Sequence, residues 1–111
     1  MKLFKEKITN KDLLELEKEF GSYFKVTVDI ENKWLVAGCE LHSDGEDILV
    51  GEGSHPRDIW GGAVDLKVKS VETLAVLNLR ASQGNASMDI LDPVIREKLI
   101  KVVKEVIWNQ K

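Results

Sequence analysis

The sequence contains very little cysteine, which limits the chemistry available to it. Cys39 is the only cysteine among 111 residues, so the chain cannot form an internal disulfide and lacks the thiols of a cysteine-rich zinc site. We expect Cys39 to be a small core residue. A reducing compartment is the simplest setting for such a chain, and we therefore expect a cytoplasmic protein.

Long apolar runs and blocks of one charge are also missing. No stretch approaches the roughly 18 apolar residues that cross a bilayer, and the N-terminus has no apolar signal-peptide core, so we expect no membrane association. Sixteen basic and nineteen acidic residues give a net charge of -3, with no basic block. This balance disfavours binding to nucleic acid by phosphate neutralisation.

The composition that remains is ordinary for a globular protein. Hydrophobic residues make up 43% of the chain and charged residues 32%. A length of 111 residues falls within the usual range of about 100 to 150 for one domain. We expect residues 1–111 to form a single domain.

Helices are predicted near both ends of the chain. Thr9 and Asp12 have the spacing of a capping box, which predicts a helix that Gly21 ends. Asp92 and Pro93 are typical of the N-cap and first residue of a final helix, and its apolar stripe extends to about residue 108.

Strands are predicted between these helices. Apolar and polar residues alternate in the segment 24–30, and we also predict strands at 34–42, 48–50, 64–68 and 71–80, a short edge strand within 1–8, and a turn at 43–45. The order of helix, strands and helix predicts an α+β domain. Its mostly antiparallel sheet would have about four to six strands, with both helices covering one face.

The densest group of polar and ionisable side chains lies in the segment 51–62, GEGSHPRDIWGG. His55 suits an acid or a base, Arg57 suits an anion contact, and Asp58 would orient either of them. The alternative is an ordered surface loop in which Arg57 and Asp58 pair while Trp60 fills the core.

A second polar loop, NLRASQGNASM, occupies residues 78–88. Its candidate ligand-binding residues are Asn78, Arg80, Gln83 and Asn85, which surround a glycine turn signal and would face the first loop. The alternative is that the side chains of Asn78 and Gln83 satisfy backbone groups and Arg80 pairs with Asp58 or Glu52 as a structural support.

A divalent metal site is the weakest of the candidate sites. Glu40 and His42 lie on one face of the predicted strand, where His55 would complete a set of three ligands. The alternative is a solvated strand end, and this spacing is not a metal signature, so we predict no metal site. The sequence does not indicate any cofactor.

Three segments of the chain carry a resemblance to a known family. They are GCELH at 38–42, DIWG at 58–61 and NLRASQGNASMDILDP at 78–93, and together they resemble a family of short prokaryotic proteins catalogued as a domain of unknown function. That family often has Pro after the arginine and Arg after QGN, where this chain has Ala81 and Ala86. This difference weakens the hypothesis that two arginines bind one anion together. The resemblance implies a cytoplasmic α+β domain, favours the same two loops, and implies no activity.

The leading hypothesis is that the chain binds a small polar or anionic ligand between segments 51–62 and 78–88. Arg57 and Arg80 would contact the anion, and His55 with Asp58 would serve any hydrolytic or transfer chemistry, which leaves open whether the protein is an enzyme. The alternative is a structural or protein-interaction module without catalytic activity, such as a homodimer in which Trp60 and its neighbouring glycines form the contact surface.

Overall fold

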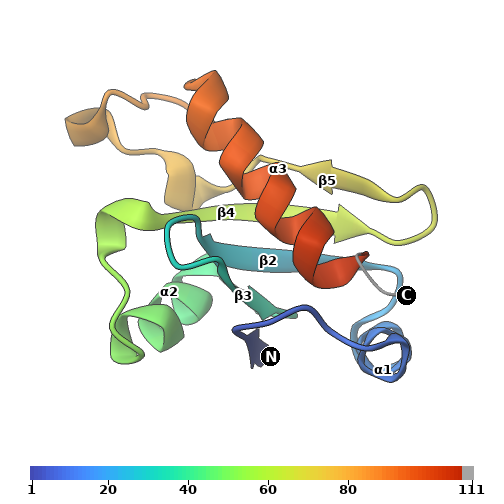
Figure 1. Cartoon of the computed structure of the whole chain (residues 1–111). Coiled ribbons are helices and arrows are strands. Elements are labelled where there is room, and N and C mark those ends of the chain that lie inside the picture. The colour runs from blue at the N-terminus through green and yellow to red at the C-terminus, as the bar shows by residue number, and fades with distance from the viewer. Residues whose placement is uncertain (109–111) are drawn as a thin grey trace.

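The computed structural model describes residues 1–108, in which one antiparallel sheet has the strand order β1-β3-β2-β4-β5 (Figure 1). The strands are β1 (Lys2–Phe4), β2 (Tyr23–Asp29), β3 (Trp34–Ala37), β4 (Ile59–Asp65) and β5 (Ser70–Glu72). The central strands β2 and β4 pair along seven residues each, whereas the outer strands β1 and β5 have only three. The predicted α+β class, antiparallel sheet and terminal helices are confirmed.

The two terminal helices pack on the same face of this sheet. In α1 (Asn10–Phe20) the capping box forms as predicted: Thr9 Oγ1 accepts from Asp12 N at 3.1 Å, and the Asp12 carboxylate accepts from Thr9 N at 3.0 Å. Helix α3 (Pro93–Ile107) lies across the sheet in Figure 1. Leu16 of α1 and Leu99 of α3 share one core with Val26 of β2. Within residues 1–108, no helix has the length and apolar character needed to span a membrane.

A third helix, α2 (His42–Gly51), packs on the opposite face and corrects two predictions. The turn predicted at 43–45 and the strand predicted at 48–50 both belong to this helix, and β3 ends at Ala37 instead of continuing to His42. Leu49 of α2 forms a separate core cluster with Val36 and Ile59, whose side chains alternate with those of the first core. The two predicted helices do cover one face of the sheet, and the third helix, which the sequence did not predict, covers the other.

The reason for a glycine inside α2 is a close contact with the sheet. A Cβ at Gly45 would collide with the hydroxyl of Thr27 in β2, so only glycine lets the helix approach this closely. Gly45 is buried one turn before Leu49 on the same side of the helix. Gly45, which indicates a turn when only the neighbouring sequence is considered, is thus required within the helix by tertiary packing.

The second half of the chain contains less strand than predicted. The short 3-10 helix η1 (Pro56–Asp58) leads directly into β4, which ends at Asp65 instead of continuing to residue 68. The strand predicted at 71–80 is correct only at its start, because β5 ends at Glu72. The following segment contains the 3-10 helices η2 (Val76–Asn78) and η3 (Ala81–Gln83) and is otherwise irregular.

Candidate functional site

The two polar loops predicted from the sequence meet at the start of β4. Arg80 Nη1 donates to Pro56 O at 2.8 Å, and Nη2 donates to Ile59 O. Gln83 Nε2 donates to Arg57 O at 3.2 Å. We call this contact between residues 55–59 and 77–85 the loop joint.

The guanidinium of Arg80 has all five of its N–H groups matched by protein acceptors. Besides the two carbonyls above, Nε donates to Leu77 O at 3.1 Å, Nη1 lies 3.2 Å from Gln83 Oε1, and Nη2 lies 3.5 Å from Glu46 Oε2. Arg80 also lies over the Trp60 ring, 4.9 Å from its centroid, and only 12% of its side chain is exposed. Burial lowers the pKa of Arg80, an effect that Glu46 opposes. An anion at Arg80 would have to displace these partners, which favours the structural-support interpretation. The carboxylate beside Arg80 is that of Glu46, however, and not that of Asp58 or Glu52 as predicted.

The side-chain amides of the two loop asparagines are also matched with backbone groups. Asn78 Oδ1 accepts from Gly61 N at 2.8 Å, and its Nδ2 donates to Gly61 O and Thr73 O, each at 2.9 Å. Asn85 Nδ2 donates to Asn78 O at 2.7 Å, and its Oδ1 accepts from Leu91 N at 2.8 Å. Both asparagines are buried, and they hold the irregular segment after β5 against β4.

Three predicted site residues keep free side chains at the loop joint. His55 and Arg57 are exposed and Asp58 is half-buried. Among residues 1–108, their side chains form no hydrogen bond or ion pair, and the alternative of an Arg57–Asp58 pair is not observed. These three residues lie on or directly before η1, whose backbone Arg80 and Gln83 hold in place.

The first loop is also anchored to the turn between β2 and β3 by the buried carboxylate of Asp29. Its oxygens accept from Glu31 N and Asn32 N at 3.0 Å each, from Asn32 Nδ2 at 2.8 Å, and from Ser54 Oγ. Burial raises the pKa of Asp29, but these four hydrogen bonds outweigh burial and hold the pKa below its usual value. Asp29 thereby fixes the residue that precedes His55.

A hollow that was not predicted from the sequence lies between the start of α2 and the segment after β5. Its volume is about 520 Å³. Its lining comprises Lys25, Leu41, His42, Ser43, Leu74, Ala75, Val76, Leu77 and Met88. Four of these are exposed large apolar side chains: Leu41 at 60%, Leu74 at 54%, Val76 at 71% and Met88 at 47%. We call this hollow the His42 groove.

A sequence signal for this groove exists in the distribution of charge. Residues 73–93 contain only three charged side chains, Arg80, Asp89 and Asp92, in a chain that is 32% charged. The predicted strand at 71–80 concealed this signal, because a strand would bury alternate apolar residues such as Leu74 and Val76. The observed irregular segment leaves both of them exposed.

His42 is the principal polar group of the groove. Its Nε2 lies 2.8 Å from Gly62 O, so Nε2 carries the proton and Nδ1 is left as an acceptor. Burial lowers the pKa of His42, which outweighs the opposite effect of the Gly62 contact, and Lys25 lowers the pKa further. The ring is therefore neutral at pH 7. Gly61 makes room for it, since a Cβ there would lie 2.8 Å from His42 Cδ2.

The structure does not assemble the metal site considered from the sequence. No group of three or more His, Cys, Asp or Glu side chains within residues 1–108 is arranged to hold a metal ion, so Glu40, His42 and His55 do not form one. The physical reason is that His42 begins α2, which removes it from the strand that would have aligned it with Glu40. Cys39 is 4% exposed, and burial raises its pKa, as expected for a core thiol.

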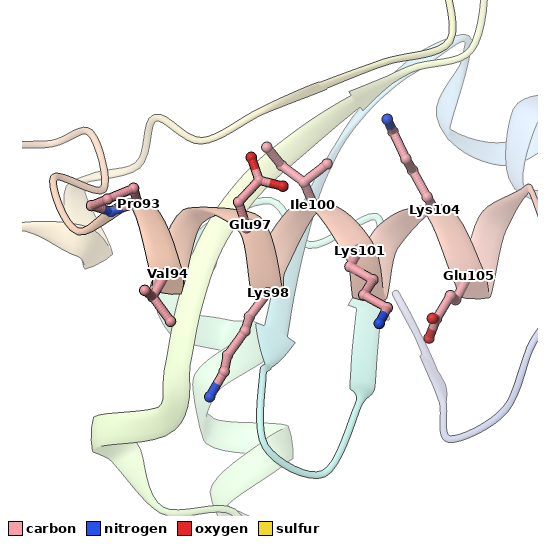
Figure 2. Close-up of a pocket in the computed structure, with 8 residues that line it drawn as sticks. All are labelled: Pro93, Val94, Glu97, Lys98, Ile100, Lys101, Lys104 and Glu105. Carbon is pink, nitrogen blue, oxygen red and sulfur yellow. The ribbon is translucent and has the colours of Figure 1, made fainter.

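Another hollow, of about 660 Å³, lies on the outer face of α3 (Figure 2). Figure 2 shows Glu97, Ile100 and Lys104 on one side of the helix and Val94, Lys98, Lys101 and Glu105 on the other. The mixture of lysine and glutamate is typical of a solvated helix face. It provides no continuous basic surface for a phosphate backbone, so nucleic acid binding gains no support here.

Comparison with known proteins gives one match. A family model described as a protein of unknown function (DUF5674) matches residues 2–106, in agreement with the resemblance carried by the three sequence segments. No curated protein and no solved structure matches the chain significantly.

Proposed function

The chain belongs to the DUF5674 family of proteins of unknown function, and we propose that it is an interaction module that binds another polypeptide through the His42 groove. The observation that supports this proposal is that Leu41, Leu74, Val76 and Met88 line one hollow while each is about half exposed or more. Large contiguous apolar patches are rare on monomeric proteins and mark interaction sites.

The low charge content of segment 73–93, which supplies five of the nine groove residues, supports a polypeptide partner. Arg80, Asp89 and Asp92 are the only charged residues in the segment 73–93, and each is occupied within the chain. Arg80 holds the loop joint, Asp89 accepts from Thr73 Oγ1, and Asp92 caps α3 by accepting from Val94 N. Depletion of charge with retention of exposed apolar side chains is typical of the centre of a protein interface.

Site-specific photo-cross-linking in cells that make the protein tests this proposal. A benzophenone amino acid would replace Val76 in one chain and Val68 in a matched chain. Val68 is 70% exposed, close to the 71% of Val76, but does not line the groove. We expect a discrete cross-linked product from position 76 and none from position 68. Absence of a product at position 76, or equal products from both positions, would contradict the proposal.

A second candidate function is binding of a small polar or anionic ligand at the loop joint. It is supported by the exposed and unpaired side chains of His55 and Arg57, which lie beside a turn whose backbone is fixed by Arg80 and Gln83. Polar groups on a rigidly held loop are well placed to bind a ligand. In this proposal Arg57 contacts the anion, and His55 with Asp58 handles any proton transfer.

Thermal unfolding with inorganic phosphate, a nucleotide or acetate tests the second candidate. A ligand at 100 times its dissociation constant adds about 2.7 kcal/mol to the free energy of unfolding. We expect one of these probes to stabilise the wild type and to lose that effect in Arg57→Gln. No stabilisation by any probe, or equal stabilisation of both proteins, would count against a site at the loop joint.

A further inference from the structure

We infer that the polypeptide that occupies the His42 groove is a second copy of the same chain, in a symmetric pair. This inference rests on the proposed interaction function and names its partner. In a twofold pair the same surface is used by both copies, so that surface must be complementary to itself.

The first support is the shape of the surface. Val76, with 71% of its surface exposed, stands at the edge of a hollow of about 520 Å³ that it helps to line. Leu41, 60% exposed, lines the same hollow from the N-cap position of α2. A projecting apolar side chain beside a hollow allows each copy to place its own side chain in the hollow of the other.

The second support is charge. A surface that meets its own copy must avoid facing like charges, and each copy has a net charge of -3. The groove carries only one charged side chain, Lys25, whose Nζ donates to the backbone oxygen of Glu40 at 2.9 Å. The rest of the lining is neutral. Two such surfaces can meet with Lys25 as the one charged groove side chain that each copy contributes.

The third support is the amount of apolar surface. A standard interface covers about 800 Å² on each partner, which is about an eighth of the 6319 Å² exposed by residues of this chain. The four exposed side chains that line the groove, Leu41, Leu74, Val76 and Met88, would form the apolar centre of a contact of this size.

Mass measurement on the purified chain tests the inference. Light scattering after gel filtration, and sedimentation equilibrium from about 1 μM to about 1 mM, cover the range from tight to weak pairs. We expect the wild type and Val68→Glu to form a dimer with the same dissociation constant. Val76→Glu is expected to raise that constant at least about 100-fold, because it places two carboxylates in one contact. The uncharged variant Val76→Gln is expected to raise it less, by about tenfold, and carries the test if the glutamate variant does not fold.

The outcomes separate this inference from the proposed function. A wild type that keeps the mass of one chain up to about 1 mM, or a dimer that Val76→Glu and Val76→Gln leave intact, would overturn the second copy as partner. A monomeric wild type that nevertheless cross-links from position 76 to a different protein would overturn this inference alone. A cross-linked product with twice the chain mass, from position 76 and not from position 68, would support both.

Discussion

The side chain of Asn78 takes the place of a neighbouring strand beside Gly61 in β4. Its Oδ1 accepts from Gly61 N at 2.8 Å and its Nδ2 donates to Gly61 O at 2.9 Å, which is the pair of bonds that an antiparallel strand would make. The backbone of β5 pairs with β4 only at Ala63, Val64 and Asp65. The Asn78 amide thus continues the hydrogen bonding of the sheet where β5 has ended.

We expect Asn78→Asp to lower the free energy of unfolding by about 3 kcal/mol or more, because a buried carboxylate cannot donate to the carbonyls of Gly61 and Thr73. Urea unfolding at pH 7 measures this loss. Asn10→Asp, at an exposed position in α1, is the matched control and should change stability by no more than about 0.5 kcal/mol. A loss below about 1 kcal/mol at Asn78 would show that the sheet does not depend on this amide.

Arg80→Lys should destabilise the chain by about 2 to 4 kcal/mol, because one ammonium group cannot reach the carbonyls of Pro56, Ile59 and Leu77 together. Arg57→Lys, at an exposed arginine without a partner in the described residues, should stay within about 0.5 kcal/mol. Chemical unfolding of both variants provides the comparison. Equal stability of the two variants would contradict a structural role for Arg80 and would favour Arg80 as a ligand contact.

The stability of the chain should fall on the acid side of neutrality because of His42. Burial lowers the pKa of His42 in the folded chain below the value of about 6.5 expected when unfolded. As pH drops from about 7 through the folded pKa, the unfolded chain binds the proton first, so the free energy of unfolding decreases. The stability that depends on neutral His42 is fully present above the unfolded pKa and is lost as pH falls through the folded pKa.

Replacement of each histidine in turn identifies the group responsible. His42→Gln retains a donor for Gly62 O and should flatten the decline measured by urea unfolding between about pH 5 and pH 7. His55→Gln, which changes the exposed histidine, should preserve the decline. The assignment is wrong if the decline survives in the His42 variant at its original size.

Two glycines of α2 should respond to alanine in opposite directions. Gly45→Ala brings a methyl group against the Thr27 hydroxyl and should cost about 1 to 3 kcal/mol despite the better helix propensity of alanine. Gly51→Ala meets nothing within 4 Å and should stabilise the chain by about 0.5 kcal/mol. Thermal unfolding of both proteins tests the packing of α2. A neutral or stabilising Gly45→Ala would be incompatible with the close helix–sheet contact.

Local sequence patterns predicted the elements that depend on local chemistry. The Thr9 and Asp12 capping box and the Asp92 cap define helix starts within a few residues, and the alternation at 24–30 identifies β2. The same reasoning failed for α2, because Ile48, Leu49 and Val50 form an apolar run that suits a strand equally well. Gly45 then favoured the wrong choice, since the contact with Thr27 that explains it is not visible in the sequence.

For the candidate site, the sequence identified unusual residues but not their partners. The two loops do meet, and Arg80 joins them as the residue types suggested. Whether an amide or guanidinium faces a ligand or a backbone group depends on where distant carbonyls lie, and no pattern in segments 51–62 or 78–88 encodes that. The prediction that Trp60 forms a contact surface is wrong, because this side chain is 1% exposed and belongs to the core.

The two outer strands bear on how the chain behaves at high concentration. Fibrils grow when a long, flat edge templates the addition of further strands, and natural proteins prevent this with short edges and charged side chains. Strands β1 and β5 offer three residues each, with Lys2 on one and Glu72 on the other. Little backbone is therefore available for edge-to-edge growth, which favours association through side chains over pairing of strand edges.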